Sequence, residues 1–92
     1  MNRSLLYNNQ GRGGTVVYKD NTSTLHFDFE FGGGDCIAII FIPSEKYWET
    51  QTGRSLSERK DILEFVAVQS AKDQTFNGTY KILDSFIELY KS

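Results

Sequence analysis

The sequence predicts an α+β domain, in which one long amphipathic helix packs on one face of an antiparallel sheet of four strands, or five if the N-terminal residues join it. Three segments, at residues 14–20, 24–31 and 79–90, are rich in β-branched and aromatic residues and are bounded by turn residues. Residues 55–73 instead repeat apolar side chains at helical spacing. With a further apolar strand and a short helix between them, the expected order is β-β-β-α-α-β.

The chain of 92 residues is long enough for one domain, which we assign to residues 1–92. Its first segment has a short apolar core, Leu5 to Tyr7, followed by Asn, Gln and Gly residues that favour a turn. We interpret residues 1–13 as either an edge strand or a loose arm, because three apolar residues do not distinguish the two. The strand at residues 14–20 then ends in a hairpin turn at the Asp20–Ser23 cluster.

The segment at residues 24–31 alternates between two kinds of side chain. Its apolar members are Leu25, Phe27, Phe29 and Phe31, and its polar members are His26, Asp28 and Glu30. This alternation is typical of an antiparallel strand with one face in the core. Imidazole and carboxylate groups also ligate divalent metals. The chain holds one histidine and one cysteine, so we favour a solvated strand face and predict no metal site.

The next segment, CIAIIFIP at residues 36–43, is apolar on both faces. It should lie in the middle of the sheet. Either both of its faces are covered, or one of them is covered by a partner chain. Pro43 ends it, because proline has no N–H to donate to a sheet. Cys36 is interpreted as a small buried hydrophobic residue, and as the single cysteine it has no partner for an internal disulfide.

Two helices are expected after this strand. Ser44 and Gly53 have the positions of an N-cap and a stop for a short helix. Ser55 and Glu58 have the spacing of a capping box, which begins the long helix that runs to about Asp73. The turn at residues 77–78 then leads into residues 79–90, which we interpret as one long strand.

The predicted helix covers only one face of the sheet, while the apolar strand at residues 36–43 and the mixed strand at residues 79–90 carry apolar side chains on both faces. A chain of this size also has a thin core. We therefore expect a homodimer, in which a second copy covers the other face through a two-fold axis.

Charge and hydropathy exclude several classes of partner. The formal net charge is −2, without a run of like charges, so nucleic acid is not expected. The longest apolar run is far shorter than the roughly 20 residues of a membrane span, so no membrane association is expected. The chain opens without a charged and then apolar leader, and a cytoplasmic location is the default expectation.

The most suggestive cluster lies beside the N-terminus of the predicted long helix and comprises Tyr47, Trp48, Arg54 and Arg59. Trp, Tyr and Arg dominate protein interfaces, and Arg beside a helix N-terminus attracts carboxylates and phosphates. A structural role is the other interpretation, in which Trp48 fills the end of the core and Arg59 pairs with an acidic residue or holds loop carbonyls.

An enzyme is not favoured. His26 is the one histidine, and no serine lies near it in a nucleophile elbow. The glycine-rich stretches at residues 11–14 and 32–34 lead into strands, whereas a phosphate loop leads into a helix.

These observations favour a small non-enzymatic interaction module that self-associates through its sheet and contacts another, unidentified protein through the Trp48–Arg59 region. The alternative is a small domain that binds an anionic ligand at Arg54 and Arg59, or a metal at the polar face of residues 26–30. No cofactor is expected.

Overall fold

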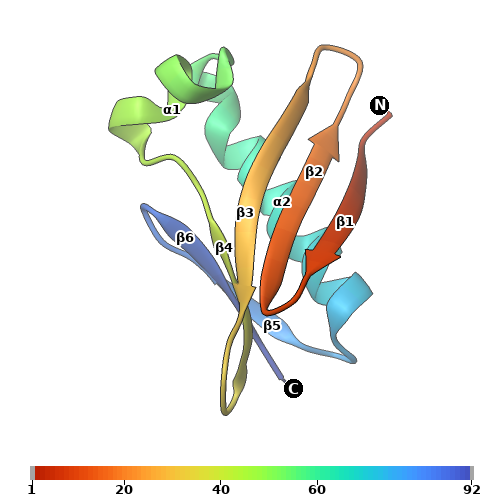
Figure 1. Ribbon diagram of the computed structural model, residues 1–92. Helices are drawn as coiled ribbons and strands as arrows, with labels where there is room; N and C mark the ends of the chain where they lie inside the picture. Colours follow the sequence, from red (N-terminus) through yellow and green to blue (C-terminus); the bar gives the residue numbers. More distant parts are fainter. Residues whose placement is uncertain (1, 92) are drawn as a thin grey trace.

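In the computed structural model, which describes residues 2–91, six antiparallel strands form one sheet with the spatial order β1-β2-β3-β4-β6-β5. The strands are β1 (Ser4–Gln10), β2 (Gly13–Lys19), β3 (Thr24–Phe31), β4 (Cys36–Phe41), β5 (Thr79–Ile82) and β6 (Phe86–Tyr90). The helices are α1 (Glu45–Thr52) and α2 (Arg59–Gln74), and a 3-10 turn, Leu56–Glu58, precedes α2. The predicted α+β class is confirmed (Figure 1).

The predicted count of four or five strands is wrong, and the predicted order fits only in part. The error lies at residues 79–90, which form the hairpin β5–β6 and not one long strand. The Leu83 N–H donates to the Phe86 carbonyl at 2.8 Å, which closes a tight turn through Asp84 and Ser85. Aspartate and serine favour such turns, so this dipeptide was the available signal in the sequence.

The N-terminal segment is an edge strand and not a loose arm. All seven residues of β1 pair with β2, from Ser4 opposite Lys19 to Gln10 opposite Gly13. A side-chain contact also joins β1 to α2, because the Tyr7 hydroxyl donates to Asp73 Oδ2 at 2.7 Å. The strand is therefore held both by its neighbour in the sheet and by the helix.

Strand β4 lies in the middle of the sheet between β3 and β6, as predicted. It pairs with β3 over only three residues, Phe29 to Phe31, and the remainder of β3 has no partner on that side. A bulge between Cys36 and Ala38 shifts the register of β4 against β6.

Helix α2 packs across one face of the sheet, behind β1–β3 in Figure 1. The predicted capping box of Ser55 and Glu58 is confirmed, and it caps the 3-10 turn that leads into α2. The buried residues of α2 are Ile62, Leu63, Val66, Ala67, Ser70 and Ala71. They meet the alternating inward side chains of the strands, which include Val16, Tyr18, Phe27, Phe29, Ile40, Ile87 and Leu89. These helix side chains, Ile62 and Val66 among them, therefore form the helical side of the core.

The opposite surface of the sheet, which we call the open face, carries no helix (Figure 1). His26, Asp28 and Glu30 lie on it and are exposed, while Leu25, Phe27 and Phe29 point to the core. The predicted solvated side of this strand is thus confirmed. Within residues 2–91, none of the helices has the length and apolar character needed to cross a membrane.

Candidate functional site

Arg54 is the centre of a buried ion network that joins the β2–β3 turn to the segment between the helices. Its Nη1 lies 3.1 Å from both carboxylate oxygens of Asp20 and 3.1 Å from Ser23 Oγ. Its Nη2 lies 2.5 Å from Glu58 Oε2. The Arg54 and Asp20 side chains are each 7% exposed. An external anion would have to displace one of these carboxylates to reach the guanidinium.

The acidic and basic side chains of this network are stabilised in their ionised forms. Burial acts to raise the pKa of Asp20, but hydrogen bonds from Tyr18, Ser23, Thr22 and Arg54 outweigh it and hold that pKa well below its usual range. Burial and the hydrogen bond to Asp20 raise the pKa of Tyr18 to about 12. The network therefore stays fully charged at neutral pH, with Tyr18 as a neutral donor.

Arg59 holds two loops against the beginning of α2. It donates to the Pro43 carbonyl from Nη2 at 3.1 Å and to the Asp84 carbonyl from Nη2 at 2.8 Å. It also forms longer ion pairs with Glu45 at 4.0 Å and with the Asp84 carboxylate at 3.7 Å. Arg59 therefore holds loop carbonyls, which is the structural role that the sequence analysis gave as one interpretation.

Trp48 belongs to the core of the chain. It is 0% exposed, and its Nε1 donates to the Ser55 carbonyl at 3.0 Å. The Arg59 guanidinium lies 6.0 Å from the centre of the indole ring. Tyr47, in contrast, is 50% exposed on α1. The structure therefore brings Trp48, Arg54 and Arg59 into internal contacts and leaves Tyr47 on the surface. Partner binding by these four residues stays a prediction.

The polar row on β3 is spread along the strand and does not converge on one point. His26 faces Val17 across the pairing with β2, and Asp28 faces Thr15. Among residues 2–91, no group of three or more His, Cys, Asp and Glu side chains is placed to hold one metal ion.

Cys36 is half-buried and lies opposite Tyr90 on the open face, so its interpretation as a fully buried residue is wrong. The bulge in β4 turns Ala38 into the core and leaves Cys36 on the other side. Burial raises the pKa of the Cys36 thiol, and the Glu88 carboxylate raises it further. The thiol is therefore protonated at neutral pH, which is unfavourable for a nucleophile.

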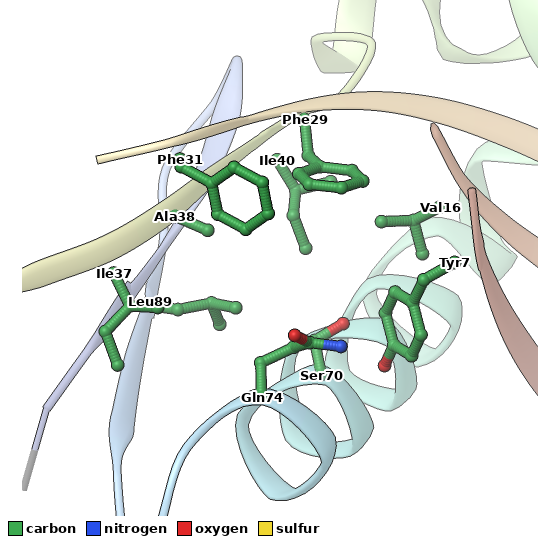
Figure 2. A pocket seen from close by; sticks show the side chains of 10 residues that line it. All are labelled: Tyr7, Val16, Phe29, Phe31, Ile37, Ala38, Ile40, Ser70, Gln74 and Leu89. Atoms are coloured by element: carbon green, nitrogen blue, oxygen red, sulfur yellow. The ribbon is translucent and has the colours of Figure 1, made fainter. Parts of the chain in front are cut away.

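The internal cavity between the sheet and α2 is small (Figure 2). Its volume of about 20 Å³ is room for about one water molecule. The side chains of Tyr7, Ser70 and Gln74 bring polar atoms to one side of it, and aliphatic and aromatic side chains form the rest (Figure 2). Enzyme and ligand pockets are typically about 300–1,000 Å³, so this cavity does not indicate a substrate site.

The largest unassigned feature of the open face is an apolar group on β4 and β6, comprising Ile39, Phe41, Phe86 and Tyr90. We call it the open-face cluster. Phe41 and Phe86 are directly opposite each other across the two strands, and Phe41 is 42% exposed. The other three side chains are half-buried without a helix above them. The pairing of β4 with β6 brings Phe86 and Tyr90 onto the same surface as Phe41.

A hollow lies beside this cluster, with a volume of about 640 Å³. Phe41 forms one side of it, and its charged lining residues are Arg12, Asp28 and Glu30. The hollow is open to solvent and has both an apolar wall and groups of both charges.

Comparisons with known proteins give no assignment: no protein-family model matches the chain, and neither a curated protein nor a solved structure matches it.

Proposed function

We propose that the chain is a small non-enzymatic interaction module that forms a homodimer through the open face of its sheet. The observation that supports this most directly is the open-face cluster, in which Phe41 at the end of β4 and Phe86 at the start of β6 are paired across the two strands without a helix above them. A sheet in a domain of this class gains stability when both apolar faces are covered, and uncovered apolar patches mark interaction sites.

A two-fold arrangement suits this surface. In such an interface both copies use the same patch of surface. If one residue of the first copy contacts a second residue of the partner, the second residue of the first copy contacts the first residue of the partner. Phe41 of each copy would insert into the hollow beside Phe41 of the other. There Arg12 of one copy would meet Asp28 and Glu30 of its partner, since all three line that hollow. The charged rim would then fix the orientation, while the aromatic side chains supply most of the affinity.

The ion network and the Arg59 hydrogen bonds do not support the alternative of an anion site, because the Arg54 and Arg59 donors already have partners. Tyr47 remains the one exposed aromatic side chain of the predicted Trp48–Arg59 region. We therefore assign any contact with a different protein at this end of the molecule to Tyr47.

Sedimentation equilibrium tests the dimer with two matched variants. We expect a mass of twice 10.5 kDa for the unchanged protein and for Tyr47→Glu, and a monomer for Phe41→Glu. Both changes place a carboxylate at a similarly exposed aromatic position, 50% and 42% exposed respectively, but only Phe41 lies on the open face. Circular dichroism establishes that each variant is folded.

The proposal fails if the unchanged protein is a monomer at concentrations up to about 1 mM, where an interface worth only about 4 kcal/mol would already assemble. It also fails if Tyr47→Glu abolishes the dimer and Phe41→Glu leaves it intact, since the interface would then lie at the α1 end.

A further inference from the structure

A second groove lies between the C-terminal half of α2 and the edge strand β5, away from the open face. We call it the α2–β5 groove. Its volume is about 380 Å³. It is lined by Val68, Ala71, Lys72, Thr75, Phe76, Asn77, Gly78 and Tyr80. Its two walls are the C-terminal half of α2 and the start of β5, joined by the loop that carries Phe76.

Apolar side chains of the groove are unusually exposed. Phe76 is 85% exposed, Tyr80 is 39% exposed and Val68 is 37% exposed. All three come from different elements, respectively the loop after α2, strand β5 and α2 itself. Such a continuous patch is costly to leave in water and indicates a contact surface.

The edge of β5 adds unpaired backbone groups to this surface. Strand β5 is the last in the sheet and pairs only with β6. In an antiparallel pair, hydrogen-bonded and non-hydrogen-bonded positions alternate. Because Leu83 donates to Phe86, Lys81 is the next residue that bonds to β6, and the backbone N–H and C=O groups of Tyr80 and Ile82 point to the free edge. An extended chain can pair with these groups.

The charges at the groove are positive. Lys72 is the one charged side chain among the residues that line it. Lys81 lies next to Tyr80 on β5, is exposed, and points to the opposite side of the sheet. A partner strand that passes along β5 would therefore meet Lys72 on its groove side. On its other side lies Lys81, whose cross-strand neighbour on β6 is Glu88. The charge that attracts acidic side chains to the groove is thus that of Lys72.

We propose that the α2–β5 groove binds an extended acidic segment of another protein, which adds a strand to the edge of β5. Main-chain hydrogen bonds to Tyr80 and Ile82 give affinity, and an aliphatic side chain of the segment packs against Phe76, Tyr80 and Val68. A carboxylate on the same face of the segment pairs with Lys72. This mode, strand addition beside a helix, is one of the recurring ways in which proteins bind peptides. It uses a surface separate from the homodimer interface.

The lysines also argue against a second copy as the occupant. Pairing of β5 with β5 of another copy around a two-fold axis would bring Lys81 of one chain close to Lys81 of the other. Like charges opposite each other destabilise a strand pair, and lysine on an edge strand is a common device against self-pairing.

An NMR titration tests the site. The probe is an acetylated and amidated hexapeptide with one central valine and glutamate at its other positions, so that carboxylates lie on both faces of the extended chain. It is added to the uniformly ¹⁵N-labelled protein. We expect saturable shifts of the amide signals of Val68, Tyr80 and Ile82, and slower hydrogen exchange at Tyr80 and Ile82. A matched peptide with lysine at each acidic position should bind at least tenfold more weakly.

Two protein variants locate the charge contact. Lys72→Glu should weaken binding about tenfold, whereas Lys60→Glu, an identical change at an exposed position in the first turn of α2, should leave it unchanged. Phe76→Ser should also weaken it, with the dimer mass unaltered.

Three outcomes overturn the proposal: the absence of saturable shifts, equal binding of the acidic and basic peptides, or shifts confined to the open face. Loss of the dimer in Phe76→Ser would also overturn it, because the groove would then be the surface of self-association. The test is independent of the homodimer proposal, since the groove can bind the peptide whether the protein is a monomer or a dimer.

Discussion

Arg54 Nη1 lies 3.1 Å from Asp20 Oδ2, and this ion pair between two side chains that are each 7% exposed joins parts of the chain 34 residues apart. Asp20 also accepts from the Thr22 and Ser23 N–H groups and from the Tyr18 hydroxyl. The pair thus fixes the β2–β3 turn against the loop that leads into α2. A buried charge that loses its partner is costly.

Replacement of Arg54 by alanine should therefore destabilise the fold strongly. We expect Arg54→Ala to lower the free energy of unfolding by about 3–5 kcal/mol, because Asp20 would stay buried without its counter-charge. Urea denaturation followed by circular dichroism measures this loss. Lys60→Ala removes an exposed charge from the first turn of α2 and should change stability by less than about 0.5 kcal/mol. Equal effects of the two variants would show that the Arg54 network contributes little.

The same pair predicts a specific loss of stability in acid. The pKa of Asp20 is depressed in the folded state, so its contribution is present above the unfolded pKa of about 3.9 and is lost progressively as the pH falls below that value. Asp20→Asn should be less stable than the unchanged protein at pH 7, and its stability should fall less steeply between pH 5 and pH 2. Urea midpoints at a series of pH values test this. Parallel curves for the two proteins would contradict it.

Much of the fold was accessible from local sequence patterns. The alternation of residues 24–31 gave β3 and its orientation, and the Ser55–Glu58 spacing gave the start of the long helix, because period and capping are local properties. The β5–β6 hairpin was missed because Leu83, Asp84 and Ser85 continue a segment rich in strand-forming residues. A two-residue turn without glycine or asparagine is a weak signal against such a background.

The candidate site was harder to predict because the same residue types serve interfaces and interiors. Trp48 and Arg54 are side chains that dominate interfaces, but here they are internal. Arg54 is internal because its ion-pair partner, Asp20, belongs to the same chain. The two residues are 34 positions apart, so a local sequence pattern does not reveal the pairing. The open-face cluster likewise joins Phe41 to Phe86 through strand pairing, which no local pattern specifies.

The buried position of Trp48 predicts a clear spectroscopic behaviour. It is the one tryptophan of the chain, so its fluorescence reports on a single environment. We expect blue-shifted emission and little quenching by iodide in the folded protein, with a shift to the red on unfolding. If Trp48 formed a surface contact instead, iodide would quench it readily in the monomer, and burial would appear only on assembly.

Trp48→Phe should also cost stability. The change removes the hydrogen bond to the Ser55 carbonyl and leaves a smaller ring in a fully buried space. We expect a loss of about 1–3 kcal/mol from the unpaired carbonyl, with a further loss from imperfect packing. The measurement is urea denaturation followed by circular dichroism, since the variant has no tryptophan to report by fluorescence. An unchanged midpoint would contradict the packing role.

The attachment of β1 depends on glycine at position 14. A Cβ at Gly14 would lie 1.9 Å from the Asn8 carbonyl oxygen of β1, which is far inside a van der Waals contact. Gly14→Ala should therefore push β1 away from β2 and weaken their pairing. We expect a loss of about 1–3 kcal/mol and faster hydrogen exchange across residues 4–10.

Gly33→Ala is the matched control, because a Cβ there meets no atom within 4 Å and the backbone needs no positive φ. It should leave both stability and exchange unchanged. The exchange pattern separates the mechanism from a general loss of stability: β1 should exchange faster in Gly14→Ala, while the amides of β4 and β6, at the other side of the sheet, keep their protection relative to the global unfolding limit. Uniformly faster exchange in all strands would mean that β1 does not open separately. The substitution at Gly14 would then destabilise the whole sheet and not the edge strand β1 alone.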